Sequence, residues 1–359
     1  MSNTRQLPPG VVDVLPAHRF DEAKLREYLE PHLEGVTESF VIKQFQGGQS
    51  NPTFFIQAGP HRYVLRKKPP GKLLPSAHQI EREYRVIQAL QDTDVPVPTT
   101  RLLCEDDSII GTPFYIMDFL EGRILEHPAL QNAAKEERWA IYEAMADTLA
   151  RLHRVDWRAV GLEDYGRPDN YVQRQIKRWS QQYEASKTHE LPAMDRLIEW
   201  LPANAPTEDE TAIAHGDFRL GNLMLHPSKP EVIAVLDWEL STLGHPLADL
   251  GYCCMPYHLP GDMPGIRGVV GLDLKEQNIP DEETFLRIYC ERVGRDGVPH
   301  WYFFLAFSLF RIAAILQGVY ARALQGNASS ADALKVGERA GVLAEIGWKL
   351  AQKAEEGGR

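Results

Sequence analysis

The stretch that decides the fold is Ala214–Pro227, AHGDFRLGNLMLHP, which lies between two apolar runs. It places His215, Asp217 and Asn222 in the spacing H-x-D-x-x-x-x-N. Short strands are predicted on either side of the loop, and a further strand, VIAVL, ends at Asp237. Because aspartate and asparagine are also ordinary turn residues, the stretch alone fits either a plain turn or the working loop of an enzyme that transfers phosphate.

The spacing is that of the kinase catalytic loop, and the chemistry explains the residue types. A carboxylate at Asp217 can orient an acceptor hydroxyl and take its proton, and the amide oxygen of Asn222 can bind Mg²⁺. Asp237 is positioned to complete a metal site that neutralises phosphate charge. Glu239 could assist the metal or face solvent, whereas we expect Asp249 in GHPLADL to brace the loop.

The first third of the chain reads as strands with one helix. Strand-forming runs occur at SFVIKQF, PTFFIQA and RYVLRKK, and two more follow near residues 101–106 and 112–120. A helix is predicted over residues 76–90, with Ser76 and Gln79 in capping-box positions.

Glu83 falls inside the apolar stripe of this helix. The stripe is formed by Ile80, Tyr84, Ile87 and Leu90. An unpaired carboxylate on a packed face is costly, so we predict a cationic partner, with Arg66 at the end of YVLR as the best candidate. Lys68 could share this role, whereas strand alternation directs Lys67 the other way. The alternative is that Glu83 reaches solvent at the rim of the lobe.

Two stretches have the character of nucleotide contacts. In FQGGQSNPTFF, Gly47 and Gly48 allow close backbone approach to phosphates, and Ser50 or Asn51 could donate hydrogen bonds. A plain hairpin explains this turn nearly as well, because GxGxxG is absent. FYIMDFLEG has the character of a lobe connector whose backbone could read an adenine edge, the alternative being a buried strand that runs into a turn. The contacts expected there are Met117, Asp118, Phe119 and Leu120.

The pattern becomes helical after LEGR. Helices are predicted over residues 135–155, 281–293, 301–324 and 330–356. We therefore predict an α+β fold of two lobes. Residues 1–118 form a small, β-rich nucleotide-binding lobe with an N-terminal helical extension, and residues 119–359 form a larger helical lobe with the catalytic loop and the acceptor site.

Composition narrows the class of protein. A formal net charge of −11 over 359 residues argues against a general nucleic-acid binder, which needs a basic surface. The four cysteines lack CxxC spacing, so reduced thiols and a cytoplasmic location are expected. Arg311 and Arg322 interrupt the apolar run Trp301–Leu324, which favours a core helix over a membrane span. The amino terminus shows no signal pattern.

With these residues assembled, the chain resembles the aminoglycoside phosphotransferase and choline kinase-like superfamily. HGDFRLGN and DWELSTLGHPLADL carry the resemblance, which extends from about Val41 to the last helix. Together with YVLRKKPPG, they look most like the kinase-like domains found beside, or fused to, acyl-CoA dehydrogenases. The resemblance implies a protein kinase-like fold and ATP- and Mg²⁺-dependent transfer of phosphate to a small-molecule hydroxyl.

Carried over by residue, the resemblance implies Asp217 as the base and Asn222 and Asp237 as Mg²⁺ ligands. It also implies that Arg66 and Glu83 form the pair that aligns the phosphates, although arginine departs from the usual lysine. Arg219 matches the place where protein kinases carry a lysine near the γ-phosphate.

The branch further suggests the acceptor, a hydroxylated acyl group such as a hydroxy acid or a CoA thioester, and an acyl-CoA dehydrogenase as a candidate partner. Residues that could line the acceptor cleft, or simply pack, are His245, Tyr252, Tyr257, His258 and Arg311. An aminoglycoside or amino-alcohol kinase stays open because acidic surfaces suit polycations. So do a non-catalytic nucleotide- or acyl-CoA-binding pseudokinase and a metal-dependent phosphohydrolase, although kinase spacing fits better than the latter.

Overall fold

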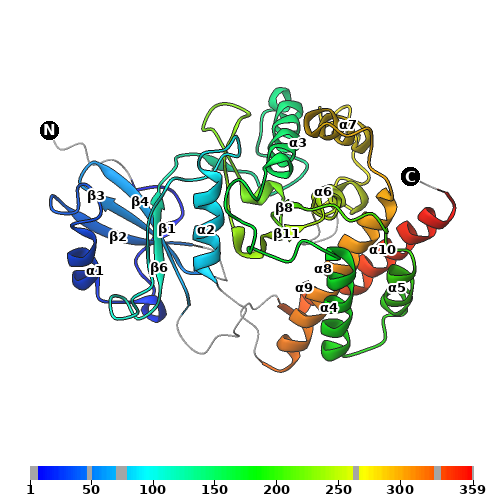
Figure 1. Ribbon diagram of the computed structural model, residues 1–359, viewed down its shortest axis with the longest axis horizontal. Helices are drawn as coiled ribbons and strands as arrows, with labels where there is room; N and C mark the ends of the chain where they lie inside the picture. Colours follow the sequence, from blue (N-terminus) through cyan, green and yellow to red (C-terminus); the bar gives the residue numbers. More distant parts are fainter. Residues whose placement is uncertain (1–6, 47–50, 70–78, 262–266, 327–332, 358–359) are drawn as a thin grey trace. The chain divides into compact units, whose positions relative to one another are not determined.

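The computed structural model describes residues 7–46, 51–69, 79–261, 267–326 and 333–357. The chain divides into two compact units (Figure 1). The first comprises residues 1–92 and 97–121, and the second comprises residues 93–96 and 122–359. The boundary expected after residue 118 therefore lies three residues before the observed one, and a short segment preceding the fifth strand belongs with the second unit.

The first unit is built on a six-stranded antiparallel sheet in the order β1-β2-β3-β4-β6-β5. The strands are β1 (Val11–Val12), β2 (Phe40–Phe45), β3 (Thr53–Ala58), β4 (His61–Lys67), β5 (Thr100–Cys104) and β6 (Phe114–Asp118). Arg66, on the central strand β4, pairs in register with Thr53 on β3 and Tyr115 on β6. The predicted strands are thus present, and the expected phosphate-aligning residue lies in the middle of the sheet.

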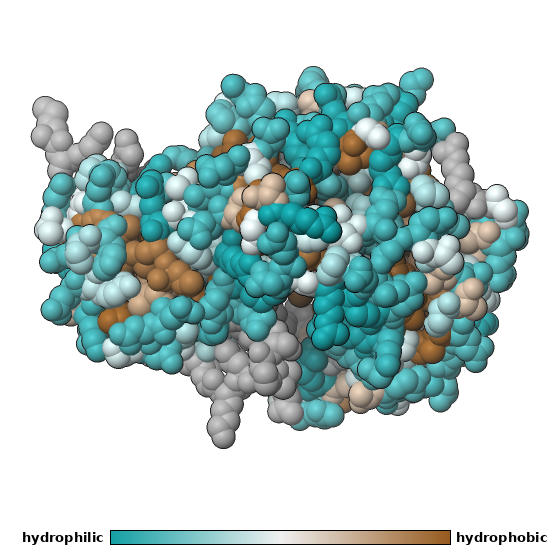
Figure 2. Space-filling model, in the orientation of Figure 1, coloured by the Kyte–Doolittle hydropathy of each residue, from teal (hydrophilic) through white to brown (hydrophobic). Residues whose placement is uncertain are grey.

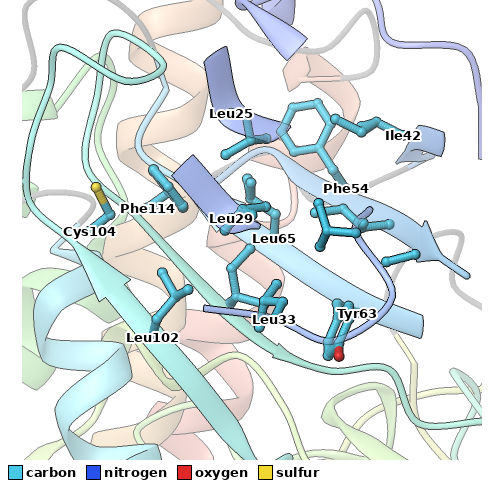
Figure 3. Close-up of a cluster of buried hydrophobic side chains, with 14 of the residues drawn as sticks. Leu25, Leu29, Leu33, Ile42, Phe54, Tyr63, Leu65, Leu102, Cys104 and Phe114 are labelled. Atoms are coloured by element: carbon cyan, nitrogen blue, oxygen red, sulfur yellow. The ribbon is translucent and has the colours of Figure 1, made fainter. Parts of the chain in front are cut away.

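Two helices cover the sheet. Leu25 and Leu29 of α1 (Glu22–Leu29) pack into a buried cluster with Phe54, Leu65 and Phe114 (Figure 3). This is the expected N-terminal helical extension. The other helix, α2 (Ile80–Leu90), packs against β5 and β6, where the Tyr84 and Tyr115 rings meet edge to face. Because side chains alternate along β6, Tyr115 and its neighbour Phe114 serve opposite faces of the sheet.

The start of α2 differs from the prediction. The helix begins at Ile80, so Gln79 is its N-cap residue rather than a residue of its first turn, and the Gln79 side chain makes no capping hydrogen bond. Ser76, the other residue of the expected capping box, lies outside the described residues. The buried face contains Val86 as well as Ile80, Glu83, Ile87 and Leu90, while Tyr84 is only half-buried.

The second unit is mainly helical. Its helices are α3 (Arg138–Arg154), α4 (Tyr171–Ser186), α5 (Pro192–Ala203), α6 (Pro246–Cys254), α7 (Glu282–Val293), α8 (Trp301–Leu324), α9 (Ala333–Gly337) and α10 (Ala340–Glu355). Two small antiparallel sheets carry the loops of interest: β10-β9-β7 and β11-β8. Their strands are β7 (Arg123–Ile124), β8 (Ala212–Ala214), β9 (Leu223–Leu225), β10 (Val232–Val235) and β11 (Thr242–Gly244).

Helix α8 forms the centre of the second unit and packs against α4, α6 and α10. Within the described ranges it is the one helix whose length and composition would suffice to cross a membrane, with a mean hydropathy of 1.7, yet 72% of that apolar window is buried inside the protein. It is therefore the core helix that its interrupting arginines predicted. The face of the molecule drawn in Figure 2 is mainly hydrophilic, in keeping with the charged composition.

Three helices of the second unit were not predicted: α4, α5 and α6. In α4 the buried residues are widely spaced among polar ones, and α5 contains Pro202 near its end. The single helix predicted over residues 330–356 is wrong in its first part, because α9 ends at Gly337 and α10 begins at Ala340. A side chain at Gly337 would collide with Tyr320 of α8, so glycine permits close packing at this break.

Candidate active site

The loop that follows β8 is held in place by its glycine. Gly216 has φ +81°, and a Cβ there would lie 2.6 Å from the Leu240 carbonyl oxygen. Only glycine suits both the left-handed backbone and this close approach. His215, fully buried, donates from Nε2 to the Leu236 carbonyl oxygen at 2.9 Å, and its Nδ1 accepts from the Asp217 N–H at 3.2 Å. The histidine therefore ties the loop to the end of β10.

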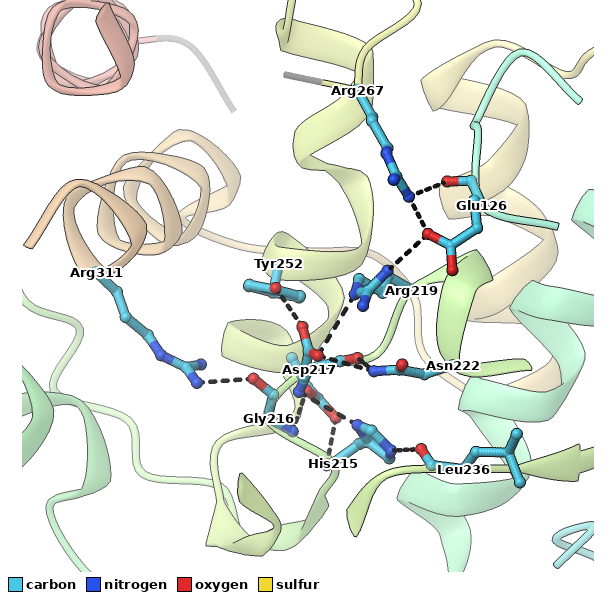
Figure 4. A network of polar contacts seen from close by, with 11 residues as sticks. Glu126, His215, Gly216, Asp217, Arg219, Asn222, Leu236, Tyr252, Arg267 and Arg311 are labelled. Atoms are coloured by element: carbon cyan, nitrogen blue, oxygen red, sulfur yellow. Dashed lines mark hydrogen bonds and ion pairs between the residues drawn. The ribbon is translucent and has the colours of Figure 1, made fainter. Parts of the chain in front are cut away.

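Asp217 has a hydrogen-bond donor at each carboxylate oxygen (Figure 4). Oδ2 accepts from Asn222 Nδ2 at 2.8 Å and lies 3.4 Å from Arg219 Nε. Oδ1 accepts from the Tyr252 hydroxyl. Burial and the adjacent Asp217 carboxylate raise the pKa of Tyr252 above its usual range, so its hydroxyl stays protonated and donates.

Asn222 and Asp237 lie close together in the backbone and fit a magnesium site. The Asn222 Nδ2 donates to both the backbone oxygen and Oδ2 of Asp217, each at 2.8 Å, which leaves its amide oxygen for a cation. The Asn222 carbonyl accepts from the Leu236 N–H at 2.8 Å, next to Asp237. Asp237 has φ +63°, a conformation that costs about 1 kcal/mol for a residue other than glycine and is found mostly at functional sites.

No group of three or more histidine, cysteine, aspartate or glutamate residues suited to a metal occurs among the residues that the structure describes. Mg²⁺ usually binds one or two carboxylates and completes its shell with phosphate and water oxygens. One amide and one carboxylate are therefore compatible with a magnesium ion that is bound together with a nucleotide.

Asp249 braces the loop from helix α6, as expected from the sequence. It is 3% exposed, and its carboxylate accepts from the N–H groups of His215 at 2.7 Å and Gly216 at 2.9 Å. Burial raises the pKa of Asp249, but the hydrogen bond from His153 and the charge of His153 and His215 outweigh burial and keep that pKa below its ordinary value. The carboxylate is thus a fixed negative anchor for the loop backbone.

Arg219 lies over the loop near the side chains of two carboxylates. Besides Asp217, its Nη1 is 3.9 Å from Glu126 Oε2, and Glu126 also forms an ion pair with Arg267. A Cβ on Gly221 would meet the Arg219 guanidinium, so this glycine leaves room for it. The expectation that Arg219 contacts the γ-phosphate stays a prediction.

A cavity of about 140 Å³ opens beside Asp217 in the second unit, between Tyr252 and Arg219. Its walls are mostly apolar and include Tyr142, Met145, Met255, Tyr257, Leu259 and Phe285. The Tyr142 and Tyr257 hydroxyls donate to the carbonyls of Pro128 and Pro280, at 2.7 and 2.9 Å. Arg219, Glu126 and Arg267 also line the cavity. It is therefore a hydrocarbon-lined space with the Asp217–Tyr252 pair and one charged cluster as its polar features.

The first unit contains a second polar cluster, centred on Glu83. Glu83 is 1% exposed, and Arg66 Nε lies 2.8 Å from its Oε2. The predicted Arg66–Glu83 pair is confirmed. Asn51 donates to Glu83 Oε1 at 2.7 Å, and the Tyr115 hydroxyl donates to Oε2 at 3.2 Å. The Asn51 side chain is therefore oriented by Glu83, a contact that no sequence pattern indicated.

The neighbouring lysines separate as strand alternation predicted. Lys67 is buried, with its ammonium 5.7 Å from the centroid of the Phe20 ring, and burial lowers its pKa. Lys68 forms an ion pair with Glu81, not with Glu83. Arg66 is thus the strand cation that faces Glu83.

The connector after β6 corrects part of the expectation for adenine contacts. The N–H groups of Asp118 and Phe119 donate to the carbonyls of Thr99 and Arg62, at 2.8 and 3.1 Å, so neither is available to a base. The Asp118 carboxylate binds Arg101, and the Phe119 ring packs on Phe55. Met117 and Leu120 stay predicted contacts. Gly47, Gly48 and Ser50 lie outside the described residues.

Of the five residues expected near the acceptor, Tyr252 and Tyr257 line the cavity. His258 instead lies 2.7 Å from Glu282, and buried Arg311 donates to the Gly216 carbonyl at 2.7 Å. His245 is the N-cap of α6, where its Nδ1 accepts from the Leu247 N–H at 3.2 Å. Glu126 and Arg267 were missed, because ion pairs between residues 141 positions apart leave no local signal.

The fold and the loop define a two-lobed phosphotransferase of the kinase-like class. Solved structures of a choline kinase from Cryptosporidium parvum and of a spectinomycin phosphotransferase with ADP and spectinomycin share the fold. Each is 14% identical with a TM-score of 0.62, and the alignments cover 94% and 92% of this chain and 97% and 98% of the respective solved chains.

The chain belongs to the phosphotransferase enzyme family, whose model matches residues 41–277. A solved structure from Ralstonia eutropha, named as a candidate aminoglycoside phosphotransferase, is 50% identical over 93% of this chain and 99% of that one, with a TM-score of 0.86. Mouse acyl-CoA dehydrogenase family member 10 is 48% identical over 91% of this chain. The match spans only 31% of the mouse protein, so the chain corresponds to a minor part of its length.

Proposed function

We propose that this phosphotransferase is an ATP- and Mg²⁺-dependent kinase that phosphorylates a hydroxyl on an acyl-type acceptor, such as a hydroxy acid or its CoA thioester. The observation that carries the proposal is the position of Asp217. Its carboxylate lies at the wall of an apolar cavity and is held there by Tyr252 and Asn222.

The proposed step is a direct transfer. The acceptor hydroxyl gives its proton to Asp217 while its oxygen bonds to the γ-phosphorus of ATP, and the bond between that phosphorus and the β–γ bridging oxygen breaks. ADP leaves with the electron pair of the broken bond. Asp217 supplies both orientation and the proton acceptor, and Arg219 lies close enough to it to stabilise charge on the transferred group.

Residues in both units support nucleotide binding. Arg66, oriented by Glu83, is the proposed contact to the α- and β-phosphates, and Leu120 the proposed contact to adenine. Asn222 and Asp237 would hold Mg²⁺, which when bound neutralises phosphate charge. The spectinomycin phosphotransferase that shares the fold was solved with ADP, which is consistent with an adenine nucleotide as the donor.

The cavity favours an acyl acceptor over a polycationic one. Apart from Glu126, which already forms ion pairs with Arg219 and Arg267, its lining contains no carboxylate among the described residues. An aminoglycoside ammonium would be poorly solvated there, whereas a hydrocarbon chain gains about 0.8 kcal/mol for each buried CH₂. A cavity of 140 Å³ is close to the roughly 150 Å³ that accommodates benzene in an engineered protein core.

The relatives' names support the acyl part of this proposal only by association. The dehydrogenase activity in the mouse protein's name is not proposed for this chain, because the match spans a minor part of that protein. An acyl-CoA dehydrogenase, on the same chain or separate, is instead a proposed functional partner that acts on the same acyl group.

Mass spectrometry of products tests the proposal. The protein is incubated with ATP, Mg²⁺ and, in separate reactions, hydroxyacyl-CoAs, hydroxy acids, amino alcohols and aminoglycosides. We expect phosphorylated product with the acyl acceptors and little with the polycations. Exclusive phosphorylation of aminoglycosides or amino alcohols would contradict the acceptor. Calorimetric binding of ATP without any product would indicate a pseudokinase, and rapid phosphate release without an acceptor would indicate a phosphohydrolase.

A further inference from the structure

Helix α6 contacts the catalytic loop through two residues of one face. Asp249 and Tyr252 are three positions apart, so their side chains are neighbours on the helix surface. Asp249 accepts from the backbone N–H groups of His215 and Gly216, and Tyr252 donates to the carboxylate of Asp217. One helix face therefore fixes both the course of the loop and the side chain expected to act as the base.

The orientation of this face is set by the packing of α6 on α8. A Cβ on Gly251 would lie 2.9 Å from the Phe304 carbonyl oxygen, so the two helices approach closely at this glycine. Arg311 of α8 lies 5.5 Å from the centroid of the Tyr252 ring and donates to the Gly216 carbonyl. The Tyr252 ring is thus held from behind by the same arginine that holds the loop.

We propose that Tyr252 is a positioning residue for Asp217, and that its hydroxyl and the Asn222 amide hold the two carboxylate oxygens in the orientation that serves the acceptor. The inference rests on the proposed function for the role of Asp217 as the base. Without the Tyr252 donor, Oδ1 would lose its partner and the carboxylate could rotate toward Arg219, whose Nε is 3.4 Å from Oδ2.

Tyr252→Phe tests this, because it removes one hydroxyl and keeps the ring on Arg311. Tyr165→Phe is the matched control: Tyr165 is fully buried in the same unit, and its hydroxyl bonds to Ser241 at 2.7 Å, outside the proposed machinery. We expect Tyr252→Phe to lower kcat about 10- to 100-fold, the range for a lost hydrogen bond to a charged group, with KM for ATP unchanged. Tyr165→Phe should keep kcat.

A crystal structure of each variant makes the test independent of turnover. We expect the Asp217 carboxylate to rotate or to occupy two rotamers in Tyr252→Phe, and to keep one orientation in Tyr165→Phe. An unchanged Asp217 in Tyr252→Phe, or equal kcat in both variants, would overturn the positioning role. If the wild-type protein phosphorylates no acceptor, the proposed function fails, and the Asp217 orientation in the two variant structures still decides whether Tyr252 positions it.

Discussion

Asp217 combines a fixed position with access to an apolar space. Both of its oxygens accept hydrogen bonds from neutral groups, Tyr252 and Asn222, while Arg219 lies slightly farther away. Neutral donors orient a carboxylate without the strong attraction of a close bidentate ion pair, which would make its protonation harder. The arrangement suits a residue that has to receive a proton during each turnover.

Asp217→Asn keeps the size of the side chain and removes its ability to accept the proton. We expect kcat to fall by about 10²- to 10⁴-fold, the usual contribution of a general base. ATP binding, measured by titration calorimetry in the presence of Mg²⁺, should stay within a few-fold of wild type. Near-normal turnover by this variant would show that Asp217 is not the base.

Glu83 has the equivalent position in the first unit, where a single carboxylate orients Arg66 and Asn51. Glu83→Gln removes the charge that holds Arg66, so we expect KM for ATP to rise about tenfold, equivalent to 1.4 kcal/mol. Glu81→Gln, one helical position away on the solvent side, is the control, because Glu81 pairs with Lys68 and is 31% exposed. Steady-state kinetics at varied ATP should distinguish the two variants; equal KM values would contradict a role for the buried pair.

At the scale of the element, helix α6 links acid stability to the active site. Its N-cap, His245, is 3% exposed, and burial lowers the pKa of His245 from about 6.5 to about 4. The folded state therefore favours the neutral imidazole. This contribution is fully present above the unfolded pKa of about 6.5 and is lost as the pH falls toward the folded pKa of about 4, with an upper limit of about 3 kcal/mol.

His245→Asn tests this link, because asparagine is a good N-cap and does not titrate. Between pH 7 and pH 5 we expect the free energy of unfolding of the wild-type protein to fall more steeply than that of the variant, by about 1–2 kcal/mol. Urea unfolding at each pH measures the difference. Parallel pH dependence in the two proteins would show that His245 is not buried as a neutral group.

The elements that sequence could predict are those with a local pattern. The strands of the first unit and helices α3, α7 and α8 have clear periodicity, and Glu83 was noticed because it interrupts an apolar stripe. Helix α6 has no such pattern: nearly all of its residues are buried, so no amphipathic period exists. The Tyr252–Asp217 contact joins residues 35 positions apart and depends on the packing of α6 on α8, which residue spacing does not encode.

For the whole molecule, the two units divide the chemistry. The first contains the Arg66–Glu83 pair and the connector, and the second contains the loop, the proposed Mg²⁺ ligands and the acceptor cavity. The net charge of −11 makes close approach of a polyphosphate unfavourable, so binding should depend on these specific cations and on Mg²⁺. The nucleotide is therefore expected to stabilise the protein only when both sets of residues are intact.

Thermal unfolding with and without Mg²⁺ and ATP measures this dependence. A ligand at about 100 times its Kd stabilises the folded state by about 2.7 kcal/mol, so the wild-type Tm should rise clearly. Asp217→Asn should keep the full rise, because it removes the base and not a nucleotide ligand. Glu83→Gln should reduce the rise both with Mg²⁺ and in EDTA, since Arg66 contacts phosphate directly. Asp237→Asn should reduce only the part that Mg²⁺ adds. A full Mg²⁺-dependent rise in Asp237→Asn would exclude Asp237 as a metal ligand while leaving Asp217 as the base.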